Sequence, residues 1–167
     1  MNAIFTRRSV RKFNDTVVEA EKIEKLLRAA MQAPSSKNQQ CWEFIVVTKK
    51  EDIQKLSKTH TGAKPLETAN AVIVVLGNSK RMVMAERWQQ DLGAVTQNIL
   101  LQATELDLGS LWCGIAPDAE REKMVREMYN LDDSLYIYST IGIGYPHKED
   151  ALKFVDRFDE NRITYIK

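Results

Sequence analysis

The hydrophobic residues of this chain alternate between helical and strand-like spacing. Residues 18–34 carry apolar side chains at the i, i+3, i+4, i+7 and i+8 spacing of a helix with one buried face, namely Ile23, Leu26, Leu27, Ala30 and Met31. The segment WEFIVVT, residues 42–48, is a β-branched and aromatic run of strand length. A short amphipathic helix is predicted over residues 51–58, so the first half should run helix, strand, helix.

The second half continues this mixture of elements. NAVIVVLG, residues 70–77, is almost continuously apolar, which is typical of a strand in the middle of a sheet. Residues 84–107 form the longest helical pattern, and its thin polar side predicts a core helix that ends before Gly109. Strands are predicted over residues 110–115 and 135–144, with a helix between them.

The tail and the length complete the predicted architecture. Residues 154–167 hold aromatic side chains without a clean period, which indicates an arm that packs along another surface. The order of elements predicts an α+β fold, a mixed sheet with helices on its faces. Because 167 residues suffice for one sizeable core and not for two ordinary ones, a single domain over residues 1–167 is expected.

Composition and charge exclude several classes of protein. The chain is 44% hydrophobic and 28% charged, close to soluble globular averages, which argues against disordered or fibrous structure. A formal net charge of +1 argues against a general binder of nucleic acid or anionic membranes, because such proteins are usually basic over a whole face.

Targeting signals and metal motifs are not evident either. No apolar run approaches the roughly 18 residues needed to span a bilayer, and an Arg pair stands where a signal peptide needs its apolar core. We therefore expect a cytoplasmic protein. Cys41 and Cys113 show no CxxC spacing, and His60 and His147 lie far apart, so we expect reduced thiols and no metal site.

The segment TRRSVRKF, residues 6–13, concentrates positive charge around Ser9. Arginine forks match phosphate oxygens in a two-point geometry, and a neighbouring hydroxyl adds a donor without further repulsion. A helical turn here would place Arg7 and Arg11 on one face, able to touch two parts of an extended anion. A solvated basic patch is the alternative, and phosphorylation of Ser9 is another.

A second polar cluster, APSSKNQQCW, covers residues 33–42. Its Ser, Asn and Gln side chains supply hydrogen-bond donors and acceptors without fixed charge, which suits a sugar alcohol or the edge of a heterocycle. Taken alone, the segment also fits an ordinary loop between a helix and a strand.

Four motifs together carry a resemblance to a known family. RRSVRKF, AAMQAPSSKNQQCWEFIVV, DLGAVTQNILLQATELDLGSLWCGI and GIGYP resemble the FMN-dependent nitroreductase family, in order and through nearly the whole chain. The resemblance implies a nitroreductase-like three-layer fold with a central, mostly antiparallel sheet, a long core helix and a C-terminal arm. It also implies a homodimer with FMN at the subunit interface.

The resemblance assigns the first motif and several other positions to one subunit's share of the FMN site. Arg7 and Ser9 match the residues at the phosphate and ribityl end, and Arg8 is a possible helper. Arg11 matches a cation near the flavin N1 and O2 edge, where it stabilises the negative charge of the reduced ring. Looser matches are Lys64, as a second cation near the pyrimidine ring, and Arg157, as a phosphate ligand. Lys12 is left facing solvent.

The other matches fall on the polar loop and on the predicted strand over residues 110–115. The family's loop reaches the flavin of the other subunit, and the corresponding residues are Pro34, Ser35, Ser36, Asn38 and Gln40. Cys41 stands where the family commonly has Pro, which loosens the loop without removing a ligand. Cys113 and Gly114 match the segment whose backbone N–H faces flavin N5. A backbone N–H can make this hydrogen bond whatever side chain the residue carries.

The implied activity is an oxidoreductase that passes hydride from NAD(P)H through flavin N5 to a small planar acceptor, such as a nitroaromatic or a quinone, in a ping-pong cycle. No catalytic side chain is required, because the chemistry belongs to the cofactor. GIGYP follows the last strand and opens no helix, so it is no dinucleotide fingerprint, and NAD(P)H is expected to visit transiently. The alternatives are a specialised flavin reaction, reductive dehalogenation or azoline oxidation, and a non-catalytic FMN-binding module.

Overall fold

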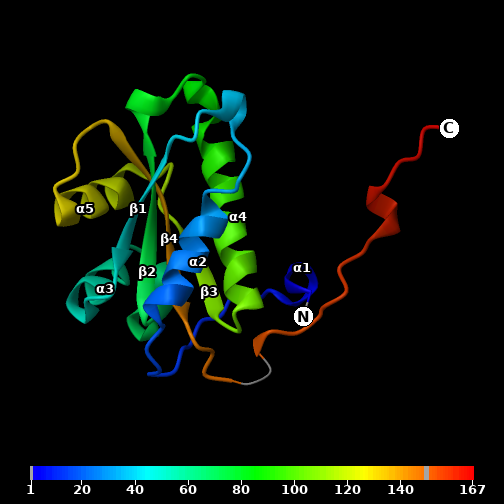
Figure 1. The fold of residues 1–167 in the computed structure, drawn as a ribbon, viewed down its shortest axis with the longest axis horizontal. Coiled ribbons are helices and arrows are strands. Elements are labelled where there is room, and N and C mark those ends of the chain that lie inside the picture. Colours follow the sequence, from blue (N-terminus) through cyan, green and yellow to red (C-terminus); the bar gives the residue numbers. More distant parts are fainter. Residues whose placement is uncertain (1, 149–150) are drawn as a thin grey trace.

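The computed structural model describes residues 2–148 and 151–167 and shows three layers (Figure 1). Four strands form one antiparallel sheet in the order β1-β2-β4-β3. Helices α2 and α4 pack on one face of this sheet and α3 and α5 on the other. The elements are α1 (Ala3–Thr6), α2 (Ala20–Ala30), β1 (Trp42–Val47), α3 (Lys50–Leu56), β2 (Ala71–Asn78), α4 (Trp88–Glu105), β3 (Gly109–Gly114), α5 (Ala119–Tyr129) and β4 (Leu135–Gly144).

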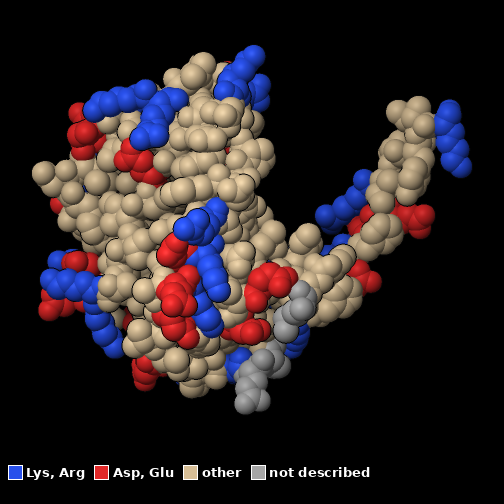
Figure 2. All heavy atoms as spheres, in the orientation of Figure 1, with Lys and Arg blue, Asp and Glu red and all other residues tan. Residues whose placement is uncertain are grey.

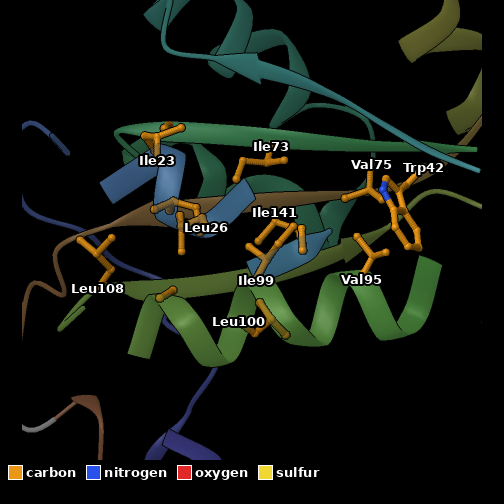
Figure 3. Packing of buried hydrophobic residues seen from close by; sticks show 14 of the residues in the cluster. Ile23, Leu26, Trp42, Ile73, Val75, Val95, Ile99, Leu100, Leu108 and Ile141 are labelled. Carbon is orange, nitrogen blue, oxygen red and sulfur yellow. The ribbon is translucent and has the colours of Figure 1, made fainter. Parts of the chain in front are cut away.

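The sheet is buried at its centre, as the apolar run of β2 predicts. β2 pairs with β1 on one side and with β4 on the other, and its residues 71–77 are all buried. Figure 3 shows Leu26 of α2 and Ile99 of α4 meeting Ile73 and Ile141 of the sheet, and all four are fully buried. Burial of such side chains is the main favourable term in folding, so this cluster fixes how α4 lies on the sheet.

The predicted α+β, three-layer architecture is confirmed, with small differences at element ends. α4 begins at Trp88 and not at residue 84, because residues 85–87 form a separate 3₁₀ turn. A longer 3₁₀ segment, η2 (Thr61–Thr68), lies where no element was predicted. No helix within residues 2–148 and 151–167 is both long and apolar enough to cross a membrane.

The C-terminal segment is an extended arm, as predicted, and it leads away from the body of the subunit (Figures 1 and 2). The ring of Phe154 packs edge-on against that of Phe5, with 6.0 Å between centroids. Farther along, Phe158, Tyr165 and Ile166 are 73%, 70% and 97% exposed. The described part of this chain therefore does not supply the surface along which the end of the arm would pack.

A glycine on β3 allows the basic segment to approach the sheet. A Cβ at Gly109 would lie 2.8 Å from Cβ of Val10, too close for carbon atoms. Gly109→Ala should therefore destabilise the protein by about 1–3 kcal/mol, the usual cost of overpacking, measured by urea unfolding. Gly114→Ala is the matched control on the same strand, because a Cβ there meets nothing within 4 Å. Equal stability of the two variants would contradict this close contact.

Candidate functional site

The basic segment after α1 is extended and lies along the edge of the sheet. Val10 donates its N–H to the carbonyl of Ser110 on β3 at 2.9 Å, and Ser9 forms a parallel bridge with Ser110. Val10 and Phe13 are buried, Arg11 and Lys12 between them are exposed, and Arg7 and Arg8 before them are half-buried. The segment therefore does not form the helical turn that would align Arg7 with Arg11, because backbone pairing with β3 holds it extended.

Three arginines converge at the start of this segment. Arg7, Arg8 and Arg157 line a hollow of about 350 Å³, together with Phe5 and Phe154 at the root of the arm. Burial, and then the charges of Arg8 and Arg157, lower the pKa of the Arg7 guanidinium. The predicted grouping of Arg7, Arg8 and Arg157 is thus present in the structure.

The described residues provide no ion pair for this arginine cluster, although Asp156 lines the same hollow. Arg8 donates from Nη1 to the Arg7 carbonyl, whereas its Nε and Nη2 atoms are buried and have no hydrogen-bond partner among the described residues. Among the described residues, no carboxylate forms an ion pair with Arg7, Arg8 or Arg157. Buried donors without partners are costly, so the cluster fits a compact anion with several acceptor oxygens.

Ser9 and Arg11 lie apart from this arginine cluster. Both line a second hollow of about 290 Å³, together with Lys12 and His147. Arg11 is exposed, and its Nη1 lies 3.5 Å from the carbonyl of Ser9. Lys12 is exposed, as predicted. The structure thus divides the basic segment into two parts and places Ser9 with Arg11 and not with Arg7.

The end of β3 presents a backbone N–H at an open edge. Ile115 donates its N–H to the carbonyl of Tyr138. Along an antiparallel strand, successive residues alternate between directing their backbone N–H toward the partner strand and away from it. Gly114 therefore directs its N–H away from β4, and Arg121 Nη1 donates to its carbonyl at 3.2 Å. Cys113 has the opposite orientation, so of the two predicted residues Gly114 offers the accessible N–H.

The side chain of Cys113 is structural. Its thiol is buried and donates to the carbonyl of Gly62 in η2 at 3.7 Å. Burial raises the pKa of the Cys113 thiol to about 11, while the charge of Arg11 acts in the opposite direction. Lys64 is exposed on the same 3₁₀ segment. These contacts bring η2 close to the end of β3, where Gly114 lies.

The polar loop between α2 and β1 adopts an unusual backbone. Lys37, Asn38 and Gln40 have φ angles of 52°, 53° and 43°, in the left-handed region that non-glycine residues rarely adopt. Gln40 donates its N–H to the Ser35 hydroxyl at 3.1 Å and its Nε2 to Asn38 Oδ1 at 2.8 Å. Pro34 is exposed at the start of the loop. The predicted residues Ser35, Asn38 and Gln40 thus form one hydrogen-bonded unit.

Sequence reasoning missed two residues that hold this loop. Asp91 of α4 accepts hydrogen bonds from the N–H and the hydroxyl of Ser36, and Gln39 donates to it at 2.6 Å. Both Asp91 and Gln39 are buried. One signal was available, because Asp91 falls one turn before Val95 on the apolar face of the predicted core helix.

The basic segment and the polar loop lie at opposite ends of α4. Asp91 holds the loop at the first turn, whereas Glu105 at the last turn accepts the N–H of Ala3 in α1 at 3.2 Å. At 1.5 Å per residue, the helix separates these two anchors by about 21 Å. Figure 1 shows α1 and the loop over residues 35–40 at the two ends of α4. One chain therefore does not bring the two predicted halves together.

A larger hollow, of about 600 Å³, contains none of the predicted residues. It is lined by Phe13, Lys50, Glu67 and Asn70, among others. The size of a hollow does not by itself indicate a function, and the predicted cofactor-binding residues all lie outside this one.

Comparison with known proteins identifies the family. The model of the Nitroreductase family matches residues 4–71 and 61–145. A protein of Archaeoglobus fulgidus named NADH dehydrogenase/NAD(P)H nitroreductase is 41% identical over 165 residues, covering 98% of this chain and 95% of that protein.

Solved structures agree with this match. The crystal structure of an NADH oxidase from Clostridium acetobutylicum has a TM-score of 0.95 at 49% identity, covering 99% of each chain. An FMN-dependent nitroreductase from Clostridium difficile has a TM-score of 0.90 at 32% identity, covering 99% of this chain and 98% of that one. The resemblance in the four sequence motifs is thereby confirmed, and the chain belongs to the nitroreductase family.

Proposed function

We propose that this chain is an FMN-dependent oxidoreductase that takes hydride from NADH or NADPH and passes it to a small planar acceptor. The observation that carries the proposal is the arginine cluster, because Nε and Nη2 of Arg8 are buried beside Arg7 and Arg157 without hydrogen-bond partners among the described residues. A phosphate monoester fits these donors in number and charge. Family relatives named for FMN, NADH and NAD(P)H support the choice of cofactor and donor.

The residues of one subunit would divide the cofactor between them. Arg7, Arg8 and Arg157 would hold the phosphate, and Ser9 would lie toward the ribityl chain. Arg11 and Lys64 would supply positive charge near the pyrimidine edge, where such charge stabilises a reduced ring. Gly114 would direct its backbone N–H toward N5, and Cys113 would contribute through packing of the strand. FMN, when bound, supplies a two-electron centre that accepts and returns hydride.

A second copy of the chain would complete the site. Pro34, Ser35, Ser36, Asn38 and Gln40 would contact the flavin held mainly by the other subunit. The separation of about 21 Å along α4 supports this division, because one chain presents the two halves at opposite ends of that helix. The exposed apolar side chains of the arm support a homodimer as well, since burial against a partner is favourable.

The donor and the acceptor would use the same open face in turn, which gives a ping-pong cycle. The donor would leave after its hydride is transferred, and a nitroaromatic or quinone would then occupy the space it vacates. We assign the whole of residues 1–167 to this one FMN-binding unit. Cys41 and Cys113 are free thiols, which fits the cytoplasmic location that forms part of the proposal.

The purified protein should show flavin absorption in the visible range, which NADH or NADPH should bleach in the absence of oxygen. Addition of a quinone or a nitroaromatic should then restore the colour by reoxidising the flavin. This step should not require the nucleotide and the acceptor to be bound at the same time. A colourless protein that binds no added FMN would contradict the whole proposal. A yellow protein that neither nucleotide bleaches would instead support a non-catalytic FMN-binding module, and turnover of halogenated substrates alone would indicate the specialised reaction.

Arg8→Met should weaken FMN binding about 10- to 100-fold, because it removes charge-assisted hydrogen bonds while keeping the apolar stem of the side chain. The flavin-free variant should unfold at the same or a higher urea concentration than the wild type, because a buried guanidinium with unpaired donors has been removed.

Arg28→Met is the matched control. Arg28 is exposed on α2 and pairs with Glu24, so its loss should leave FMN affinity unchanged. An Arg8→Met variant that binds FMN as tightly as the wild type would refute the assignment. A variant that loses stability and affinity together would indicate a structural role for Arg8.

A further inference from the structure

Asp91 is a buried carboxylate that the proposed chemistry does not use. Its side chain belongs to the first turn of α4 and is 5% exposed. Among the described residues, no Lys, Arg or His lies within ion-pair distance of it. A buried charge without a counter-charge is costly unless hydrogen bonds and dipoles stabilise it. The hydrogen bonds that stabilise the Asp91 carboxylate therefore indicate its role.

The side-chain hydrogen bonds that this carboxylate forms within the described part of the chain all tie it to the polar loop. Oδ1 accepts the N–H and the hydroxyl of Ser36, both at 3.0 Å, and Oδ2 accepts Nε2 of Gln39 at 2.6 Å. The start of α4 adds favourable backbone dipoles, since acidic groups are stabilised in the first turn of a helix. The helix thus holds the loop through one acidic side chain.

Gln39 extends this network to a third segment. Its Oε1 accepts the N–H groups of Val83 and Met84, each at 2.9 Å, and its Nε2 also lies 3.3 Å from the Met84 carbonyl. Gln39 is 7% exposed and directs its amide inward, whereas its neighbours Asn38 and Gln40 are exposed. Gln39 is therefore held in place by its hydrogen bonds, whereas the exposed side chains of Asn38 and Gln40 remain available to contact a ligand.

The backbone of the loop requires such support. Lys37, Asn38 and Gln40 all adopt left-handed φ angles. Each such residue costs about 1 kcal/mol or more, because Cβ approaches the neighbouring carbonyl oxygen. Without the bonds to Asp91, the loop would relax toward ordinary backbone angles, and the side chains of Asn38 and Gln40 would change direction.

We propose that Asp91, acting through Ser36 and Gln39, is the positioning residue that holds the polar loop in its flavin-contacting form before the cofactor binds. The inference rests on the proposed function, in which this loop contacts the flavin of the other subunit. Asp91 itself touches no cofactor atom in this account. Because Asp91 orders the strained loop in the flavin-free protein, FMN binding does not have to supply the free energy of ordering it.

Asp91→Asn is the direct test. The substitution replaces one carboxylate oxygen by an N–H₂ donor that meets the Gln39 Nε2 donor, so the contact between helix and loop is lost. We expect the Kd for FMN to rise by about 10-fold or more, a change typical of losing a residue that orients direct ligands. Hydrogen exchange of the Ser36 amide should also speed up in the flavin-free protein, because that N–H loses its charged acceptor.

Exchanging the carboxylate of Asp91 and the amide of Gln39 between the two positions should restore the FMN affinity that Asp91→Asn loses. In the double variant D91N/Q39E, the new amide on α4 keeps an oxygen for Ser36 and donates its N–H₂ to the new carboxylate on the loop. The other oxygen of that carboxylate accepts the N–H groups of Val83 and Met84. The Kd should return to within about threefold of the wild type, while Q39E alone, with two facing carboxylates, should bind as poorly as D91N. A double variant as weak as the single ones would overturn the proposal.

Thr96→Val separates positioning from general loss of stability. Thr96 is fully buried on the same helix, but its hydroxyl faces Ser139 of β4 at 3.4 Å and not the loop. This variant should lower the urea midpoint and leave the Kd for FMN within about twofold of the wild type. An equal rise in Kd for Thr96→Val and Asp91→Asn would overturn the assignment.

If Asp91→Asn does not fold, Gln39→Met, which keeps the side-chain volume, should raise the Kd in the same direction, and an unchanged Kd overturns the inference. If the wild-type chain binds no FMN, the proposed function fails, and exchange at Ser36 still tests the positioning role: unchanged protection in Asp91→Asn overturns it.

Discussion

The length and the fixed placement of α4 are the constraint on which the other features depend. The helix is clamped by apolar contacts to α2 on one side and to the sheet on the other, so neither end can shift without disrupting the core. Its first turn holds the polar loop through Asp91, and its last turn holds α1 through Glu105. The two candidate halves of the site are therefore rigidly separated within one chain. In the proposed function, a second chain would complete the site.

Both halves contain features that disfavour folding of the isolated chain. At one end, three guanidiniums converge without an ion pair to any described carboxylate, and two buried nitrogens of Arg8 have no hydrogen-bond partner among the described residues. At the other end, the Asp91 carboxylate is buried without an ion pair to any described cation, and three non-glycine residues hold left-handed φ angles. Such unfavourable features tend to cluster at functional sites, where a ligand compensates for them. The phosphate of an anionic cofactor would compensate for the first, whereas the hydrogen bonds between Asp91 and the loop compensate for the second within the chain.

The sequence pattern predicted the strands and most helices because their signals are local. The apolar run of β2 and the periodicity of α4 needed no knowledge of the rest of the chain. The extended course of the basic segment could not be predicted, because it depends on the pairing of Val10 with Ser110, a contact between residues far apart in sequence. The roles of Asp91 and Gln39 depend likewise on tertiary contacts, so the motif indicated the outward residues of the loop and not those that hold it.

The division of each flavin site between two subunits is the central claim, and complementation tests it most directly. One variant carries Arg7→Ala with Arg8→Ala, and the other carries Asn38→Ala with Gln40→Ala. Each homodimer should lose FMN, because both of its sites are defective. Purified through two different tags, the heterodimer should recover about one tightly bound FMN, because symmetry collects all four changes in one site and leaves the other intact. A heterodimer as empty as its parents would show that each chain builds its own site and would contradict the account.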